Sequence, residues 1–267
     1  PLATRGACIT IRKFSKKPLG MQNLLKFGSI DERMSVFLER SVKARKNIVV
    51  AGGTGSGKTT LLNILSAACS ESDRIVTIED SAELQLQQNH VVTLEARPAN
   101  MEGKGAVTIR DLVKNAMRMR PDRIIVGECR GGEALDMLLA MNTGHDGSMT
   151  TTHANSPQEA LRRLESLALM SGIDLPAKAI REQIAYAVDL LVHQTRFSDG
   201  SRRVTSITEV IGLDEGQIET REIFGYRRKA TSETGEVAGE FFATGYLPSY
   251  LTEFLAMGII KDGDSYL

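Results

Sequence analysis

Residues 52–59 read Gly52-Gly53-Thr54-Gly55-Ser56-Gly57-Lys58-Thr59, a stretch that matches the pattern G-x-x-x-x-G-K-[ST] in full and decides the fold. A short apolar run, residues 47–51, precedes it, and residues 59–65 have the composition of a helix. Glycines between such a strand and helix let the backbone curl, so that successive N–H groups and the helix N-terminus face one anion. By average residue frequencies the pattern arises by chance in on the order of one per cent of chains of this length. We therefore expect a phosphate-binding loop.

The chemistry of such a loop assigns roles to its residues. Lys58 can reach the β- and γ-phosphates of a nucleotide, and the Thr59 hydroxyl can take one coordination position on Mg²⁺. The expected cofactors are therefore ATP and Mg²⁺. The expected nucleotide-binding residues are Gly52, Gly53, Thr54, Gly55, Ser56, Gly57, Lys58, Thr59 and Thr60.

Strand-like and helix-like segments alternate along the rest of the chain. Residues 74–78 and 123–127 are short runs rich in Ile and Val, typical of strands that are buried on both faces of a parallel sheet. Residues 7–12 alternate like a further strand, followed by a Pro/Gly break. Beyond Asp189 the pattern becomes β-like again, at residues 190–192, 204–213 and 217–224.

Helical signals fill the intervals between these runs. Residues 31–45 and 107–119 carry apolar side chains at helical spacing. Thr108 and Ser156 each have an acidic residue three positions later, the pattern of a helix start. A last helix is expected at residues 248–257. The chain is therefore predicted to be an α/β protein with a mostly parallel sheet flanked by helices, plus a smaller mixed carboxyl-terminal part.

Composition excludes several classes of protein. The 267 residues include 33 basic and 33 acidic ones, so no net field draws the chain onto nucleic acid. A neutral total charge does not exclude a local basic groove. We expect no stable nucleic-acid partner. No apolar run approaches the ~20 residues of a membrane-spanning helix, and the first residues lack the apolar stretch of a secretion signal. Three widely spaced cysteines suit neither a disulfide framework nor a zinc site. These features favour a cytoplasmic protein with only peripheral membrane contact.

Two acidic positions are candidates for hydrolytic chemistry, which needs a carboxylate at a strand's carboxyl end to orient the attacking water. The run 123–126 leads into Gly127 and Glu128, and the run 75–78 leads into Glu79 and Asp80. For either position alone, a solvated loop carboxylate is an equal alternative. Their repeated placement beside a phosphate loop favours catalysis. We expect Glu128 to be the main water-orienting residue, with Glu79 as its competitor. The expected metal ligands are Thr59, Asp80 and Glu128.

Histidines and arginines give weaker signals. His153 follows three threonines at the end of a strand-like run, where it could donate a hydrogen bond to a γ-phosphate. On spacing alone a core or surface role is preferred for His153, and His90 and His193 are expected to be structural. Basic residues also cluster between residues 97 and 123. By default we interpret this cluster as a solvated helix face; the alternative is that one of its arginines acts as an arginine finger for a neighbouring subunit. The cluster comprises Arg97, Arg110, Lys114, Arg118, Arg120 and Arg123.

Four blocks in this order resemble the secretion ATPase superfamily, whose members power pilus assembly, type II secretion and type IV secretion. The blocks are the phosphate loop, the acidic segment 74–83, the strand and glutamate at 120–128, and the histidine segment 144–153. Residues 130–145 look closer to one branch, the CpaF-like ATPases of tight-adherence (Flp) pili and their archaeal relatives. The likeness covers roughly residues 9–213.

The resemblance implies a RecA-like fold, Mg-ATP hydrolysis near subunit boundaries, and a homohexameric ring that is cytoplasmic and peripheral at the inner membrane. It also implies that His153 senses the γ-phosphate, so the expected catalytic residues are Glu128, Glu79, Lys58 and His153. Residues 1–20 are then expected to be the remnant of an N-terminal domain and its linker, and residues 21–267 the motor domain. Within the motor domain, residues about 225–267 are expected to form a carboxyl-terminal extension of uncertain structure.

The leading hypothesis is a motor that converts ATP hydrolysis into domain motion on an inner-membrane platform protein, for pilus assembly or secretion. A type IV secretion ATPase that moves protein or DNA–protein substrates is a close alternative, because it shares the four blocks. A non-hydrolysing nucleotide switch is an alternative of another class, against which the intact Glu79 and Glu128 argue. A RecA-like DNA motor is disfavoured by the neutral charge.

Overall fold

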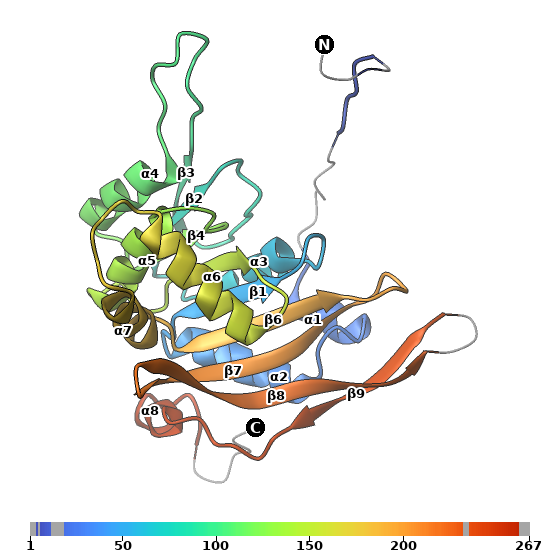
Figure 1. Ribbon diagram of the computed structural model, residues 1–267. Helices are drawn as coiled ribbons and strands as arrows, with labels where there is room; N and C mark the ends of the chain where they lie inside the picture. The colour runs from blue at the N-terminus through green and yellow to red at the C-terminus, as the bar shows by residue number, and fades with distance from the viewer. Residues whose placement is uncertain (1–3, 5, 12–18, 232–234, 262–267) are drawn as a thin grey trace.

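The computed structural model describes residues 4, 6–11, 19–231 and 235–261 of the chain (Figure 1). One nine-stranded sheet runs through this part, in the order β3-β2-β4-β5-β1-β6-β7-β8-β9. The first six strands in that order are parallel to one another, as predicted for most of the sheet. They are β1 (Ile48–Gly52), β2 (Arg74–Glu79), β3 (His90–Glu95), β4 (Arg123–Val126), β5 (Met149–His153) and β6 (Leu190–Arg196).

Helices cover both faces of the parallel strands, and this is why β1 and β4 are buried along their whole length (Figure 1). One face packs against α1 (Met21–Lys26), α2 (Glu32–Lys43), α3 (Lys58–Ser66) and α8 (Leu251–Ala256). The opposite face packs against α4 (Ile109–Ala116), the 3₁₀ turn η1 (Met117–Met119), α5 (Glu133–Asn142), α6 (Pro157–Leu169) and α7 (Ala177–Ala187).

The helix starts predicted from local signals are confirmed. The Thr108 hydroxyl accepts a hydrogen bond from the Asp111 backbone N–H at 3.1 Å and opens α4. The Ser156 hydroxyl accepts one from the Glu159 N–H at 3.1 Å and opens α6. Each cap satisfies a backbone donor that the first turn of a helix leaves without a partner.

The carboxyl-terminal part continues the sheet through an antiparallel meander of β7 (Arg202–Asp214), β8 (Gln217–Thr231) and β9 (Val237–Ala243). The helix predicted at 248–257 is present as α8. Its Phe254 lies 6.4 Å from the ring of Phe37 in α2, and Phe37 lies 5.6 Å from Phe224 in β8. These aromatic contacts place β8 and α8 in the same core as α2.

The prediction of a strand at residues 7–12 is wrong for its described residues, 7–11. Residues 6–11 form no strand, and Ile9 and Ile11 are 88% and 78% exposed, while Arg12 lies outside the described residues. A strand needs a neighbour for its backbone hydrogen bonds, and within the described residues none pairs with this segment. Conversely, β3 was not predicted, because this edge strand is half-exposed and lacks a clear apolar run.

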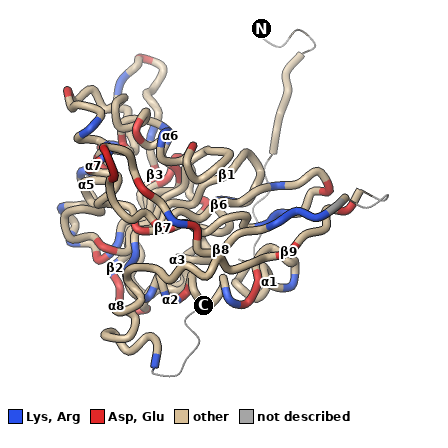
Figure 2. The backbone as a smooth tube through the Cα atoms, turned by 60° about the horizontal axis from the view of Figure 1, so that its bottom comes forward, with Lys and Arg blue, Asp and Glu red and all other residues tan. Residues whose placement is uncertain are grey.

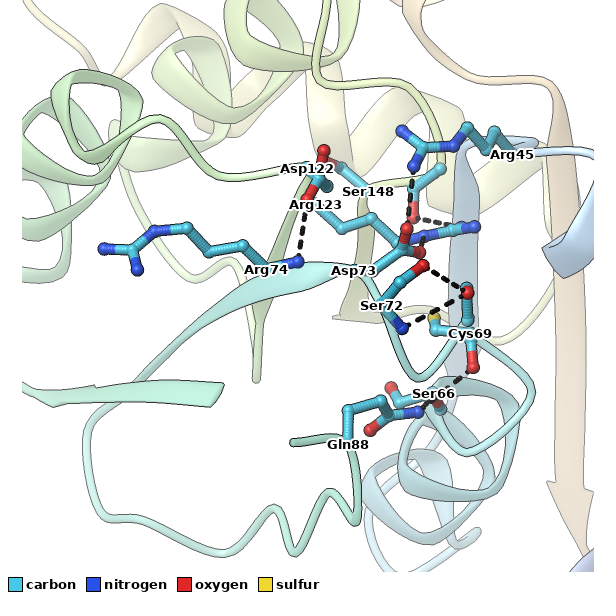
Figure 3. A network of polar contacts seen from close by, with 12 residues as sticks. Arg45, Ser66, Cys69, Ser72, Asp73, Arg74, Gln88, Asp122, Arg123 and Ser148 are labelled. Carbon is cyan, nitrogen blue, oxygen red and sulfur yellow. Dashed lines mark hydrogen bonds and ion pairs between the residues drawn. The ribbon is translucent and has the colours of Figure 1, made fainter. Parts of the chain in front are cut away.

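The expectation of a solvated arginine face is wrong for Arg123. Arg123 begins β4 and is 2% exposed; its Nε donates to Asp73 Oδ2 at 2.6 Å and its Nη1 donates to the Gly147 carbonyl oxygen at 3.2 Å (Figure 3). A carboxylate and a carbonyl therefore compensate the buried charge, which composition alone does not reveal. Arg110 on α4 also has a partner, because its Nε donates to Asp136 Oδ2 at 2.7 Å.

Charges of both signs are interspersed over the molecule, with one basic run along β8 (Figure 2). Several of its cations are already engaged: Lys229 Nζ lies 2.5 Å from Glu240, and the Arg227 guanidinium lies over the Phe242 ring at 5.0 Å. Among the helices of the described ranges, none has the length and apolar character required to cross a membrane. The three cysteines, Cys8, Cys69 and Cys129, are free.

Candidate functional site

The carboxyl ends of β1, β2, β4 and β5 meet at one edge of the sheet, because these strands run parallel. A cleft of about 780 Å³ lies at this edge. It brings together the four residues expected to be catalytic, Lys58, Glu79, Glu128 and His153, and the further expected metal ligands Thr59 and Asp80. The cleft is also lined by Thr54, Gly55, Gly57, Thr60, Ser81, Glu83, Ile109, Gly127 and Arg130.

The predicted phosphate loop joins β1 to α3 with a backbone that requires glycine. Gly55 and Gly57 have φ angles of +71° and +99°, a region that side chains rarely adopt. A Cβ atom on Gly52 would lie 2.3 Å from the carbonyl oxygen of Gln194, so the close approach of β6 excludes any side chain there. The members of the predicted nucleotide-binding set that do not line the cleft are Gly52, Gly53 and Ser56.

Lys58 is the first residue of α3, where the orphan N–H groups of the helix also face the cleft. Its ammonium is half-buried and donates to the Gly53 carbonyl oxygen at 3.2 Å. Burial lowers the pKa of Lys58, and the negative charge of Glu128 opposes that shift. A partly desolvated cation therefore lies next to a helix N-terminus, an arrangement suited to a phosphate group.

The β6–β7 hairpin supports the loop from the side opposite the carboxylates. In the sheet register Gly52 lies between His153 of β5 and Gln194 of β6. The Gln194 side chain is buried, and Arg202 of β7 donates from Nε to the Gly55 carbonyl oxygen at 2.9 Å. Sequence reasoning missed both supporting residues, because no motif links them to a loop about 140 positions earlier.

Glu79 ends β2 and is held by the loop that follows it. Its Oε1 accepts hydrogen bonds from the backbone N–H groups of Glu83 at 3.0 Å and Leu84 at 3.1 Å. Burial raises the pKa of Glu79, and these backbone hydrogen bonds act in the opposite direction. Gly127 fits closely against this side chain, because a Cβ there would lie 2.9 Å from Glu79 Cγ. Glu79 is thus fixed between β2 and β4 at the wall of the cleft.

Glu128 and Asp80 are both bound by Arg130, a residue that sequence reasoning did not assign to the site. Arg130 donates from Nε and Nη2 to Glu128 Oε2, at 2.8 and 2.6 Å, and its Nη1 lies 3.0 Å from Asp80 Oδ2. The hydrogen bond to Glu128 is the largest of the interactions that raise the pKa of Arg130. One guanidinium therefore neutralises two of the carboxylates at the mouth of the site.

The backbone at Arg130 is anchored by Glu133 in the first turn of α5. Glu133 Oε1 accepts from the N–H groups of Arg130 at 2.6 Å and Gly131 at 2.8 Å, and the Glu133 side chain is buried. The signal for this anchor was present in the sequence as a glutamate three residues after Arg130. It went unrecognised because no Ser or Thr precedes it to complete a capping box.

Of the four histidines, His153 lies inside the cleft and the other three lie outside its lining; among these, His145 Nδ1 lies 3.3 Å from the Ala140 carbonyl oxygen. His153 ends β5 beside Gly52 and lines the cleft, with an exposed side chain. His193 is buried, its Nδ1 lies 2.8 Å from Thr205 Oγ1, and burial lowers its pKa. His90 contacts Arg74 at the start of β2, far along the strand from the cleft.

The cleft offers the oxygen donors that Mg²⁺ prefers. In the described part of the chain, no group of three or more His, Cys, Asp or Glu side chains is arranged to hold a metal alone. The hydroxyl of Thr59 and the carboxylates of Asp80 and Glu128 nevertheless line the same space. Mg²⁺ in nucleotide sites commonly takes one or two protein ligands together with phosphate oxygens. The residues present therefore fit a metal that arrives with its nucleotide.

Comparison with known proteins gives concordant matches. The family model described as type II/IV secretion system protein matches residues 1–234. A putative conjugal transfer protein of Mycobacterium tuberculosis is 44% identical over 219 residues, which cover 82% of this chain and 61% of that protein. The conjugal transfer protein TrbB of Rhizobium radiobacter is 37% identical over 223 residues, which cover 82% and 65%. The chain thus spans a little over three fifths of these two curated relatives.

Among solved structures, the VirB11 ATPase of the Brucella suis type IV secretion system, crystallised with sulphate, aligns with a TM-score of 0.59 and 36% identity. The alignment covers 72% of this chain and 56% of that one. These matches confirm two predictions from the sequence, the α/β fold class and the resemblance to the secretion ATPases.

Proposed function

This chain belongs to the type II/IV secretion system protein family, and we propose that it is the ATP-hydrolysing motor part of a pilus-assembly or secretion machine. The observation that carries the proposal is the composition of the cleft. A phosphate loop, a lysine at a helix N-terminus, two strand-end glutamates and a histidine face one space. This is the set that phosphoryl transfer to water requires: cations for the phosphates, ligands for a metal and a carboxylate for the nucleophile.

The groups of the cleft have distinct roles in the proposed reaction, and Glu128 has two. The loop N–H groups and Lys58 would bind the phosphates, and Thr59, Asp80 and Glu128 would hold a Mg²⁺ ion, which would neutralise charge on the phosphates. Glu128 orients the attacking water. Glu79, which is fixed by backbone N–H groups, is the alternative to Glu128 as the residue that orients the water. His153 donates a hydrogen bond to the γ-phosphate.

Loss of the γ-phosphate would remove contacts made by Lys58 and His153, and such differential contacts are what drive a conformational change. The β6–β7 hairpin would take part, because Arg202 holds the Gly55 carbonyl. We therefore propose that hydrolysis is converted into domain motion.

The remaining proposals concern the assembly. By analogy with its family, we propose that the protein acts as a homohexamer, peripheral to the cytoplasmic face of the inner membrane, on a platform protein of the machine. Within the tight-adherence (Flp) branch, suggested by residues 130–145, the motor would add or remove pilin subunits. The domain division at about residue 20 remains part of this proposal.

Conjugative or type IV secretion is the second candidate function. It is favoured by the relatives themselves, two of which are named as conjugal transfer proteins and one as a type IV secretion ATPase. On this alternative the motor moves protein or DNA–protein substrates. The two candidates share the chemistry of the cleft and differ only in what the motion acts on.

Calorimetric titration with ATP, with and without Mg²⁺, tests the shared part of the proposal. The chain is expected to bind ATP more tightly with Mg²⁺, and Lys58→Ala is expected to weaken binding at least about tenfold, because it removes charged contacts to the phosphates. Lys178→Ala is a matched control, because Lys178 lies exposed on α7, outside the cleft. Equal ATP affinity in the Lys58→Ala variant and the unmodified chain would refute the nucleotide site.

A further inference from the structure

Asp80 and Glu128 depend on a single side chain for their orientation. Within the described residues, each carboxylate has Arg130 as its only hydrogen-bond and ion-pair partner. Two other acidic groups nearby are held by the backbone: Glu79 by two N–H groups after β2, and Glu133 by two N–H groups before α5. A change at Arg130 can therefore release both Asp80 and Glu128.

The backbone of Arg130 is held in place, whereas its guanidinium can move. Its side chain is 64% exposed, so the guanidinium has room to move. Its backbone N–H is bound at 2.6 Å to the buried Glu133, and the next N–H is bound to the same oxygen. The Cα position of Arg130 is thus held while its charged end is free to exchange partners.

A guanidinium and a divalent cation compete for the same carboxylate oxygens. Arg130 occupies Glu128 Oε2 through two donors and Asp80 Oδ2 through a third. Mg²⁺ demands close oxygen contacts and cannot take Glu128 Oε2 while two N–H groups hold that oxygen, and the adjacent guanidinium charge opposes a second cation at the remaining oxygen of each carboxylate. In addition, a carboxylate paired with arginine is a poor acceptor for the proton of an attacking water.

We propose that Arg130 is a positioning residue: it masks Asp80 and Glu128 before nucleotide binds and yields them when Mg-ATP enters. The role rests on the proposed function, because the metal and the nucleotide belong to that reaction. When Arg130 leaves the carboxylates its charge stays in the same cleft as Lys58, where phosphate oxygens provide new acceptors. Hydrolytic competence is then linked to occupancy of the site, and water activation in the empty site is suppressed.

Mn²⁺ alone is the probe, titrated without nucleotide and followed by its electron paramagnetic resonance signal. The unmodified chain is expected to bind Mn²⁺ weakly at the cleft. Arg130→Gln should bind it about fivefold more tightly, the order expected when partly exposed ion pairs are removed. Arg163→Gln, which removes the same charge from the exposed face of α6, should leave Mn²⁺ binding unchanged. The double variant Arg130→Gln/Glu128→Gln should lose the gain.

Two results would overturn the proposal. One is equal Mn²⁺ affinity in Arg130→Gln and the unmodified chain. The other is a gain that survives in Arg130→Gln/Glu128→Gln, because the metal would then not depend on the released Glu128 carboxylate. The measurement needs no turnover. A chain that shows the predicted Mn²⁺ difference but never hydrolyses ATP would contradict the proposed function alone, and an active ATPase without the difference would contradict the masking role alone.

Discussion

Asp73 is expected to be among the most costly single residues to remove from this fold. Its Oδ2 accepts from Arg123 Nε at 2.6 Å and its Oδ1 from Arg45 Nη2 at 2.7 Å (Figure 3). The two arginines differ in access to water. The side chain of Arg45 is 40% exposed, whereas that of Arg123 is 2% exposed. Without Asp73, Arg45 can be hydrated and Arg123 cannot.

The expected cost follows from that difference. Removing one partner of a buried pair leaves an uncompensated charge, which destabilises by about 3–5 kcal/mol. The half-exposed Arg45 pair adds about 1 kcal/mol or less, because solvent screens it. Arg123 keeps one hydrogen bond, to the Gly147 carbonyl oxygen, which holds the cost toward the lower end of the range. Asp73→Ala is therefore expected to lose about 3–4 kcal/mol of unfolding free energy.

Urea unfolding, followed by far-UV circular dichroism, measures this loss. Asp174→Ala, at an exposed position, is the control and should change stability by about 0.5 kcal/mol or less. The double variant Asp73→Ala/Arg123→Met should recover much of the loss, because no buried charge remains unpaired. A loss below about 1 kcal/mol for Asp73→Ala, or a double variant no more stable than the single one, would refute this reasoning.

Three further perturbations test other parts of the structure. Gly52→Ala should abolish ATP binding in calorimetry, because its Cβ would lie 2.3 Å from the Gln194 carbonyl oxygen; undiminished affinity would contradict that contact. Ser156→Ala should lower the unfolding free energy by about 1 kcal/mol through loss of the α6 cap, and no change would show the cap to be dispensable. Burial raises the pKa of Glu79 in the folded protein, which therefore retains a proton above pH 4.5 that the unfolded chain has lost. Its contribution to unfolding free energy falls as pH rises from 4.5 through the raised pKa of the folded protein, and Glu79→Gln should remove that fall, so that the stability difference between the two chains changes with pH; a difference that is independent of pH would disprove the shift.

Local signals predicted those parts of the fold whose causes are local. The phosphate loop, the Thr108 and Ser156 caps and the buried strands each depend on a few consecutive residues, and the structure contains all of them. The meeting of Glu79 and Glu128 in one cleft was predictable as well. Two parallel strands that each lead into a glutamate, Glu79 at the end of β2 and Glu128 two residues after β4, bring those residues to the same edge of the sheet.

The features that sequence reasoning missed arise from contacts between distant segments. Arg123 could not be distinguished from a solvated arginine, because its compensating carboxylate lies 50 positions earlier. The Gln194 and Arg202 supports reach the phosphate loop only through the register of β6 and β7. The role of Arg130 depends on the distance between two loops, which no spacing in the sequence encodes. Residues 7–12 have the composition of a strand, but a strand also needs a neighbour.

Phosphate release from ATP tests the central claim most directly. It should be measured with and without Mg²⁺ over a range of protein concentrations, for the unmodified chain, Lys58→Ala and Glu128→Gln. The proposed function predicts Mg²⁺-dependent release that vanishes in Lys58→Ala and falls at least about a hundredfold in Glu128→Gln while ATP binding persists. Specific activity that rises with protein concentration would further support a site completed by a neighbouring subunit. Bound ATP without Mg²⁺-dependent release, or full turnover by Glu128→Gln, would contradict the assignment of this cleft as a hydrolytic site.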